Sequence, residues 1–272
     1  MAQDRRSFNQ AIAAENTRLF AAGYYETRGV RHDFSPRIRE IIPIPAESQP
    51  ALIEKAAAAL TGEEAKISVK NGDTFSYAEE AVLNFASDWQ PGGAYLYGGS
   101  AQEECLCRQS TLYASLTAPE AALLYEENQR RRFPLASDTF LFSPYVEIFR
   151  ASPEKDYALR KHPRVTSVLT VPAPDMRGEA RHLPLEEVRR VMRRRMKAFL
   201  AAAWLHHCQS ITLGAWGCGV FAHDAKNVAE DFYTVLVSEK WQSLFSAIVF
   251  SVYGDDDKGR YNRDAFRERF GK

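Results

Sequence analysis

The sequence predicts an α/β fold in which helices cover both faces of a layered sheet. Three observations lead to this class. Short apolar runs alternate with amphipathic segments along most of the chain, which is the pattern of strands alternating with helices. Glycine-rich segments follow two of the apolar runs, as loops do where a strand leads into a helix. The chain has 272 residues, 45% of them hydrophobic, which is enough apolar material for a substantial core.

The N-terminal part of the chain is expected to be mainly helical. Apolar residues recur among charged ones over about 6–22, which indicates an amphipathic helix. Residues 31–49 contain three prolines and suit an extended connector. The segment ALIEKAAAAL at 51–60 is helical by propensity.

Beyond residue 60 the periodicity changes. KISVKNGDTF at 66–75 and EEAVLNFASDW at 79–89 indicate strands, and a helix is expected from about Ala101 to Leu116. The remaining elements are expected in this order: strands at DTFLFS and VEIFR separated by Pro144, a strand at VTSVLTVPAPD, a helix from about Pro184 to His207, a strand and glycine loop at ITLGAWGCGVF, a helix over about 224–236, a buried strand at LFSAIVFSVY and an Arg-rich terminal helix.

Charge and hydropathy exclude several classes of protein. Lys plus Arg and Asp plus Glu both number 35, so a protein that coats a nucleic-acid backbone is not expected. The N-terminus lacks the apolar run of a secretory signal. No run of about 18 apolar residues occurs that could cross a membrane. We therefore expect a cytoplasmic protein without membrane contact.

The four cysteines are interpreted as structural. Cys105 and Cys107 form a CxC, and neither Cys208 nor Cys218 has a CxxC partner. Scattered thiols of this kind are typical of small core residues rather than of a zinc site. No metal and no cofactor are expected.

The first informative stretch is PGGAYLYGGSAQEECLCRQSTLY at 91–113, which follows a predicted strand and leads into a helix. Its glycines permit positive φ and let backbone N–H groups approach a ligand. A helix N-terminus beside such a loop favours anions, phosphates in particular. The segment alone is a weak signal, because many such loops are merely tight turns.

The start of this helix also has a purely structural interpretation. Ser100 and Glu103 have the spacing of a capping box, and Glu104 is spaced to pair with Arg108. Spacing alone favours this interpretation. The concentration of polar residues directly after the glycines, Gln102 included, favours a catalytic one.

The second stretch is GAWGCGVFAHDAKNVAEDF at 214–232, where glycines lie between an apolar strand and an amphipathic helix. This is the arrangement of a diphosphate-binding loop. The segment lacks the Lys-Ser/Thr ending of a P-loop and follows a late strand, unlike an NAD fingerprint. Trp216 and Phe221 suit either stacking on a ligand or core packing. His223 is expected to be a polar residue at a helix start rather than a catalytic base.

Together the two stretches resemble the bacterial-type poly(ADP-ribose) glycohydrolases, a branch of the macrodomain fold. The signature of that family is a run of three glycines, six to eight further residues and then QEE. Here Gly92-Gly93-Ala94 is followed by seven residues and then by Gln102-Glu103-Glu104. The segments LNFAS, LCRQSTLY, SPYVEIFR and GAWGCGVF are also similar to the family, in the right order, over roughly residues 80–255.

Ala94 departs from the signature, where the family has a third glycine. If that position needs positive φ, alanine costs on the order of 1 kcal/mol. We expect that the position requires only a small side chain.

The resemblance implies a macrodomain-like mixed sheet sandwiched between helices. Residues 1–60 are then an N-terminal helical extension packed on a catalytic domain at 61–272. The implied activity is hydrolysis of the ribose–ribose O-glycosidic bonds of poly(ADP-ribose), which releases ADP-ribose. The implied substrate is the polymer or an ADP-ribosylated protein, and a monomer is expected.

The resemblance also implies roles for individual residues. Glu104 is the general acid that protonates the leaving ribose hydroxyl and then acts as the base toward water. A helix start stabilises carboxylate anions, so we expect Glu104 to act as an acid mainly in the substrate complex. Glu103 orients ribose hydroxyls, Asn84 holds the distal ribose and Gln102 braces the loop.

Further contacts with the substrate are implied for the two glycine segments. In the first segment the residues concerned are Gly92, Gly93 and Ala94, around the ribose. In the second, Gly217, Cys218 and Gly219 hold the diphosphate, Val220 is a further substrate contact and Phe221 packs near the ribose. Phe142, Tyr145 and Val146 are candidates for adenine contacts.

Three other functions stay open at this point. The first is a non-catalytic ADP-ribose reader on the same fold, which the Glu103-Glu104 pair disfavours. The second is hydrolysis of ADP-ribose from a protein side chain or a nucleic-acid base. The third is nucleic-acid binding by the basic helix at 186–197, although such runs are more typical of a solvated helix face.

Overall fold

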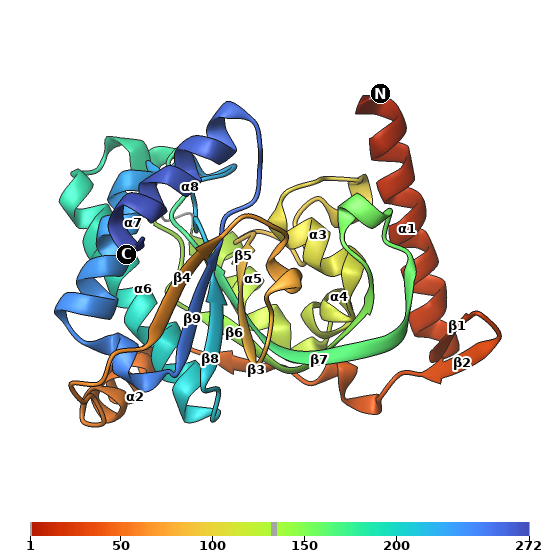
Figure 1. Cartoon of the computed structure of the whole chain (residues 1–272), viewed down its shortest axis with the longest axis horizontal. Helices are drawn as coiled ribbons and strands as arrows, with labels where there is room; N and C mark the ends of the chain where they lie inside the picture. The colour runs from red at the N-terminus through yellow and green to blue at the C-terminus, as the bar shows by residue number, and fades with distance from the viewer. Residues whose placement is uncertain (1, 132–134, 272) are drawn as a thin grey trace.

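The computed structural model describes residues 2–131 and 135–271. Its centre is a seven-stranded sheet in the order β3-β6-β7-β5-β8-β9-β4 (Figure 1). The strands are β3 (Ile42–Ile44), β4 (Lys66–Lys70), β5 (Ala81–Ala86), β6 (Phe140–Arg150), β7 (Leu159–Pro172), β8 (Ser210–Leu213) and β9 (Ala247–Ser251). The five strands from β7 to β4 run parallel, whereas β6 and β3 pair antiparallel. The sheet is mixed, as the family resemblance implies.

Helices cover both faces of the sheet, which confirms the predicted sandwich (Figure 1). One layer contains α2 (Gln49–Ala57), α6 (Leu185–Leu205), α7 (Ala225–Tyr233) and α8 (Asp257–Phe270); the other contains α3 (Gln102–Gln109), α4 (Leu112–Leu116) and α5 (Ala122–Arg131). An apolar core lies under each layer. Leu83 of β5 packs in the core with Phe199 of α6, and the adjacent Val82 packs in the core with Leu106 of α3. Successive residues of the strand thus serve opposite layers.

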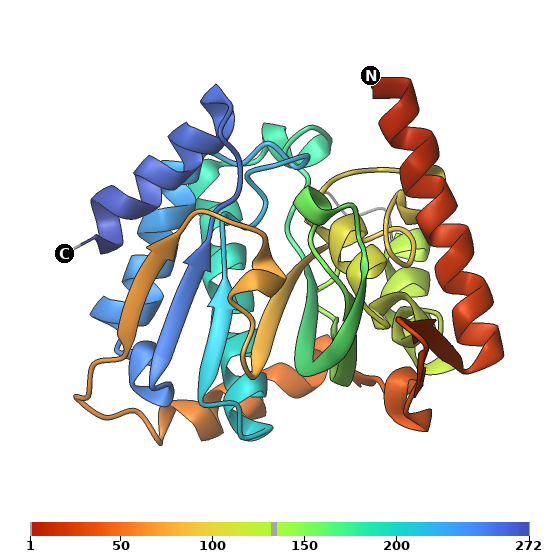
Figure 2. The ribbon, with the colours of Figure 1, turned by 45° about the vertical axis from the view of Figure 1, so that its right-hand side comes forward.

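The N-terminal part of the chain contributes more than a helical extension. α1 (Ala2–Ala22) lies beside α3 at the edge of the molecule (Figure 2). A hairpin of β1 (Tyr24–Thr27) and β2 (Val30–Asp33) follows. The extended connector expected at 31–49 is wrong in part, because β3 within it pairs with β6 and extends the main sheet.

Three further elements differ from the prediction. DTFLFS and VEIFR form the single strand β6, because a bulge between Ser143 and Val146 accommodates Pro144. The helix expected over 101–116 is divided into α3 and α4, because Ser110 between them bridges to Ile148 of β6. The third is α5, which is additional to the predicted elements.

Four of the five arginines of the basic run on α6, all but the exposed Arg190, are paired with carboxylates of the described residues. Arg189 Nη2 and Arg193 Nη1 bind Asp231 Oδ1 at 2.9 and 3.0 Å. Arg195 is 1% exposed, and its Nε binds Asp138 Oδ1 at 2.8 Å. These guanidinium groups hold neighbouring segments of the fold together, which disfavours a nucleic-acid surface on this helix.

Replacement of Arg195 by Met is expected to lower the free energy of unfolding by about 3 kcal/mol. The guanidinium also donates to the carbonyl oxygen of Pro172 at 2.9 Å. Its loss removes a buried donor from that carbonyl and leaves the Asp138 carboxylate with the partly exposed Arg194 as its arginine partner. Urea denaturation measures the effect. Arg190→Met, at an exposed position of the same helix, is the control. Equal urea midpoints for the two variants would contradict the prediction.

Candidate active site

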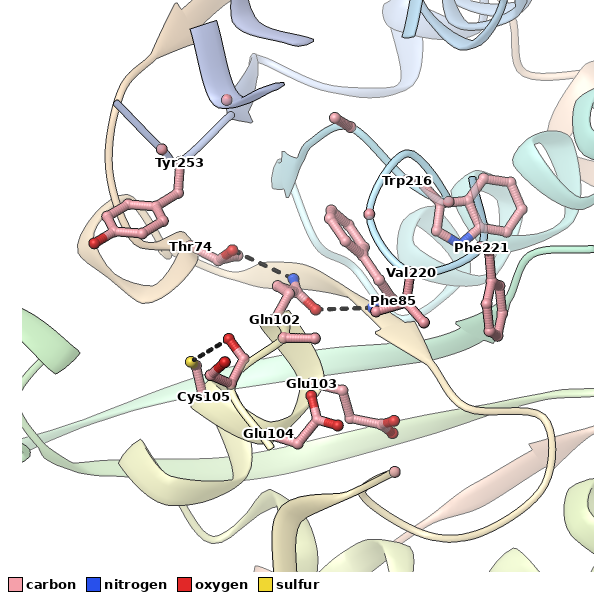
Figure 3. A pocket seen from close by; sticks show the side chains of 18 of the residues that line it. Thr74, Phe85, Gln102, Glu103, Glu104, Cys105, Trp216, Val220, Phe221 and Tyr253 are labelled. Atoms are coloured by element: carbon pink, nitrogen blue, oxygen red, sulfur yellow. Dashed lines mark hydrogen bonds between the residues drawn. The ribbon is translucent and has the colours of Figure 1, made fainter. Parts of the chain in front are cut away.

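Glu103 and Glu104 lie in the first turn of α3, and their carboxylates lie side by side (Figure 3). Both residues are buried, at 3% and 8% exposure. Glu103 Oε2 accepts a hydrogen bond from Ser87 N at 2.8 Å, and Oε1 accepts one from Asn84 Nδ2 at 3.2 Å. Burial, with a further contribution from the Glu104 carboxylate, raises the pKa of Glu103 to about 8. Glu103 is therefore mostly protonated at neutral pH.

Glu104 is anchored through one oxygen. Oε1 accepts a hydrogen bond from Ala94 N at 2.9 Å. Oε2 is buried and has no hydrogen-bond partner among the described residues. A carboxyl group that is fixed on one side and uncommitted on the other can exchange a proton with a bound molecule.

The capping box expected from Ser100 and Glu103 is wrong. α3 begins at Gln102 without a side-chain cap, because the Glu103 carboxylate binds β5 and the residues that follow it instead. The pair expected between Glu104 and Arg108 also differs from the structure. The Arg108 guanidinium donates to Cys105 Sγ at 3.6 Å.

Gly93 and Gly99 allow the loop backbone to approach the two carboxylates. Gly93 has φ +56°, and a Cβ there would lie 2.9 Å from Glu104 Oε1 and 3.1 Å from Glu103 Oε2. A Cβ on Gly99 would lie 3.0 Å from Glu104 Oε1. Ala94 has φ −89°, so the third position of the signature does not require positive φ. Alanine fits there, as expected.

Gln102 braces the start of α3 against β5 (Figure 3). Its Oε1 accepts a hydrogen bond from Phe85 N at 2.9 Å, and its Nε2 donates to Leu83 O at 2.9 Å and to Thr74 Oγ1 at 3.3 Å. The Gln102 side chain therefore makes the hydrogen bonds that a neighbouring strand would otherwise make to the backbone of this part of β5. This arrangement fixes the position of the two glutamates that follow.

Asn84 lies behind Glu103. It is fully buried in β5 opposite Thr170 of β7, and its Nδ2 donates to Thr170 Oγ1 at 3.2 Å as well as to Glu103. The amide therefore orients the Glu103 carboxylate. Direct contact between Asn84 and a ribose stays a prediction.

The second glycine loop follows β8 and turns at Gly217, which has φ +81°. Gly217, Gly219, Val220 and Phe221 line the cleft. Cys218 points elsewhere: it is 1% exposed, and burial raises the pKa of its thiol to about 12. The loop thus presents backbone and apolar side chains to a ligand, whereas the thiol belongs to the core.

Trp216 and His223 support this loop. Trp216 is fully buried, its Nε1 donates to Val171 O at 3.0 Å, and its ring packs edge-on against Phe199. His223 Nε2 lies 2.7 Å from the carbonyl oxygen of Pro174, and burial lowers the pKa of the imidazole. The arrangement favours core packing for Trp216 and a structural role for His223.

The two glycine segments line a common cleft of about 1120 Å³ (Figure 3). This volume is sufficient for a ligand of dinucleotide size. Of the sequence-predicted residues, those that line the cleft are Gly93, Ala94, Gln102, Glu103, Glu104, Trp216, Gly217, Gly219, Val220 and Phe221. Gly92, Asn84 and Cys218 lie in the layer behind it.

Several lining residues were not predicted from the sequence. Asp73, Thr74 and Tyr253 follow the carboxyl ends of the parallel strands β4 and β9, where ligands of α/β sheets bind. Their position at the carboxyl ends of two predicted strand segments is the signal that could have identified them. The two cations that line the cleft also contact the second glycine loop: Arg177 lies 5.7 Å from the Phe221 ring, and Lys258 Nζ donates to Gly219 O at 2.9 Å.

The expected adenine contacts at Phe142, Tyr145 and Val146 are wrong. All three belong to β6, which is separated from β5 by β7. Phe142 and Val146 are buried in the two cores, and Tyr145 packs under the guanidinium of Arg37. Their apolar side chains serve the sheet rather than the cleft.

Within residues 2–131 and 135–271, no group of three His, Cys, Asp or Glu side chains is arranged to hold a metal ion. No helix in the same ranges has the length and hydropathy needed to span a membrane.

Comparison with known proteins identifies the family. Residues 9–151 match the family model described as the catalytic domain of microbial-type PARG. The chain belongs to this family of poly(ADP-ribose) glycohydrolases. No curated protein matches the sequence.

Solved structures of the family share the whole architecture. The poly(ADP-ribose) glycohydrolase from Thermomonospora curvata is 35% identical, covers 97% of this chain and 100% of its own, and superimposes with a TM-score of 0.91. The same protein bound to the inhibitor ADP-HPD is 33% identical over the same shares, with a TM-score of 0.88. The Deinococcus radiodurans glycohydrolase in complex with ADP-ribose is 32% identical over 85% of this chain and 94% of its own, with a TM-score of 0.77.

Replacement of Gly93 by Ala is expected to lower the turnover of poly(ADP-ribose) about 100-fold. The new Cβ must displace the Glu104 carboxyl group, and the backbone is held at positive φ. Steady-state hydrolysis measures the loss. The control is Gly62→Ala, because a Cβ at Gly62 meets no atom within 4 Å. Native turnover in the Gly93 variant would contradict the close approach that the structure describes.

Proposed function

We propose that this glycohydrolase releases ADP-ribose from poly(ADP-ribose) with Glu104 as general acid and base. The observation that carries the proposal is the hydrogen bonding of the two oxygens of the Glu104 carboxyl group. One oxygen is fixed by Ala94 N at 2.9 Å, and the other has no partner among the described residues. The uncommitted oxygen is the one suited to deliver a proton to the leaving ribose.

The proton and the bonds balance in two steps. The Glu104 carboxyl proton passes to the ribose hydroxyl oxygen that leaves, while the bond from the anomeric carbon to that oxygen breaks through an oxocarbenium-like transition state. Glu104, now a carboxylate, accepts a proton from water as the water oxygen bonds to the anomeric carbon. The products are ADP-ribose and a shortened polymer, and Glu104 is protonated again.

Glu103 is suited to bind the hydroxyls of the ribose that is attacked. Its carboxyl group is held by Ser87 and Asn84 on both oxygens and lines the cleft beside Glu104. Because its pKa is raised to about 8, it can donate as well as accept a hydrogen bond at neutral pH. A fixed group of this kind keeps the anomeric carbon near Glu104.

The loop from Gly217 to Phe221 is suited to hold the diphosphate. It presents a glycine-rich backbone whose N–H groups can approach an anion. The N-terminus of α7 is already capped by the Asp224 carboxylate, which accepts hydrogen bonds from Lys226 N and Asn227 N. Arg177 and Lys258 flank this loop and add positive charge to a cleft whose other charged lining residues are acidic. Arg177 is oriented by its ion pair with Asp175 at 2.7 Å.

Product analysis tests the proposal. The purified protein is incubated with poly(ADP-ribose), and the products are separated by anion-exchange chromatography. Free ADP-ribose in amounts that grow with time supports glycohydrolase activity. Intact polymer with measurable ADP-ribose binding would instead indicate a reader, or a hydrolase for ADP-ribose linked to protein or nucleic acid.

We also propose that the protein acts as a monomer in the cytoplasm and does not bind nucleic acid. All four cysteines are free thiols, as is typical of proteins in reducing compartments. The pairing of the α6 arginines with Asp138 and Asp231 leaves little free charge for a nucleic-acid backbone. Light scattering of the purified protein gives its molar mass in solution and so tests whether it is a monomer.

A further inference from the structure

Helix α1 packs directly against the segment that carries the catalytic residues. It lies beside the loop at η4 (Tyr95–Tyr97) and beside α3 (Figures 1 and 2). Ala13 of α1 belongs to the same apolar core as Tyr95 and Leu106. An N-terminal helix that would otherwise be an appendage thus shares a core with the glycine loop and with the helix of Glu104.

The side chains of α1 bind the carbonyl groups at the end of the glycine loop. Arg6 Nε donates to Tyr97 O at 2.9 Å, and Asn9 Nδ2 donates to Gly98 O at 3.2 Å. Asn9 is 2% exposed, so the latter bond is shielded from water. Gly98 has φ +77°, and a Cβ there would overlap the carbonyl oxygen of Arg6. The glycine therefore permits a backbone-to-helix approach that another residue would prevent.

The loop that α1 binds is a closed turn whose other side holds Glu104. Tyr97 N and Gly99 N both donate to Ala94 O, at 3.0 and 2.9 Å. Ala94 N in turn donates to Glu104 Oε1 at 2.9 Å. Asn9 is thus connected to the Glu104 carboxyl group through one rigid turn of the backbone.

A second contact fixes the opposite end of α3. Asn16 is fully buried, and its Nδ2 donates to Arg108 O at 3.0 Å in the last turn of that helix. Its Oδ1 accepts a hydrogen bond from Arg150 Nε at 2.7 Å, and Arg150 pairs with Glu15 at 2.8 Å. Both ends of the catalytic segment are therefore attached to the same helix.

We infer that α1 is a positioning element for the Glu104 carboxyl group, with Asn9 and Asn16 as positioning residues. The inference rests on the proposed role of Glu104 as the general acid. Neither asparagine touches the substrate cleft; each acts through the backbone of the catalytic segment. Because a displacement of about 1 Å at the reacting groups can cost on the order of 100-fold in rate, loss of these contacts lowers turnover more than it lowers affinity.

The test compares three alanine variants in α1. Asn9→Ala removes the buried bond to Gly98, Arg6→Ala removes the exposed bond to Tyr97, and Arg18→Ala changes an exposed arginine of the same helix. We expect kcat for poly(ADP-ribose) to fall at least about tenfold in Asn9→Ala and about threefold in Arg6→Ala. We expect native kcat in Arg18→Ala.

Calorimetry with ADP-ribose separates positioning from loss of folded protein. We expect native stoichiometry and a Kd within about twofold of native in all three variants, because the substitutions leave the loop from Gly217 to Phe221 as it is in the native protein. A loss of kcat that matches a loss of binding-competent protein would overturn the inference. Native kcat per binding site in both Asn9→Ala and Arg6→Ala would overturn it as well. The proposed function fails separately, if the native protein does not hydrolyse the polymer.

Discussion

Replacement of Glu104 by Gln is expected to lower kcat for poly(ADP-ribose) by about 1000-fold, the loss typical of an enzyme without its general acid. The glutamine retains the carbonyl oxygen that accepts from Ala94 N, so the loop and α3 keep their arrangement. What is lost is the proton for the leaving oxygen and the carboxylate that later activates water. The Kd for ADP-ribose is expected to stay within about threefold of native, because neither function contributes to binding of the product. Single-turnover hydrolysis and calorimetry measure the two quantities.

Glu104→Asp separates the presence of a carboxyl group from its position. The shorter side chain withdraws the carboxyl group from Ala94 N by about one bond length, so we expect a loss of about 100-fold, between native and Glu104→Gln. Glu120→Gln, an exposed glutamate after α4, is the matched control and is expected to be native. If Glu104→Gln kept more than about a tenth of the native kcat, the general acid would have to be another group.

The parts of the fold that were predictable are those with local periodicity. The amphipathic pattern of α6 is visible in the sequence because the helix buries one apolar stripe. The apolar run of β5 is visible because the strand is buried on both faces. β3 was not predictable, because Ile42–Ile44 contains a proline and becomes a strand only by pairing with β6. The division between α3 and α4 likewise depends on a bridge from Ser110 to a strand about forty residues away.

The candidate site was predictable where the family signature covers it. Gln102, Glu103 and Glu104 were recognised from their resemblance to the family signature, and the structure brings them to the same cleft as the second glycine loop. The partners of Glu103 were not predictable. Local spacing favoured a capping box in which the Glu103 side chain binds the backbone N–H of Ser100. In the folded protein the Glu103 carboxyl group instead accepts hydrogen bonds from Ser87 N and the Asn84 amide.

This tertiary environment of Glu103 leads to a prediction about stability and pH. Burial, together with the Glu104 carboxylate, raises the pKa of Glu103 from 4.5 to about 8. The folded protein therefore holds the proton more tightly than the unfolded chain does. The stabilisation is complete below about pH 4.5 and is lost as the pH rises through 8. Glu103→Gln cannot ionise, so its free energy of unfolding should exceed that of the native protein by at least about 2 kcal/mol at pH 9 and by less than about 1 kcal/mol at pH 5.

The same variant separates stability from function. Glutamine replaces the protonated acid without a donor conflict if the Asn84 amide turns over. Asn84 Oδ1 is buried and has no partner among the residues that the structure describes, so after the turn it can accept from the new amide. A ribose hydroxyl, in contrast, loses a carboxyl partner, and we expect kcat/KM to fall about 100-fold. Urea denaturation at pH 5 and pH 9, with Glu120→Gln as control, measures the first effect. A stability difference that is the same at both pH values would mean that Glu103 is ionised in the folded protein at neutral pH, and the donor role proposed for it toward the ribose would then be untenable.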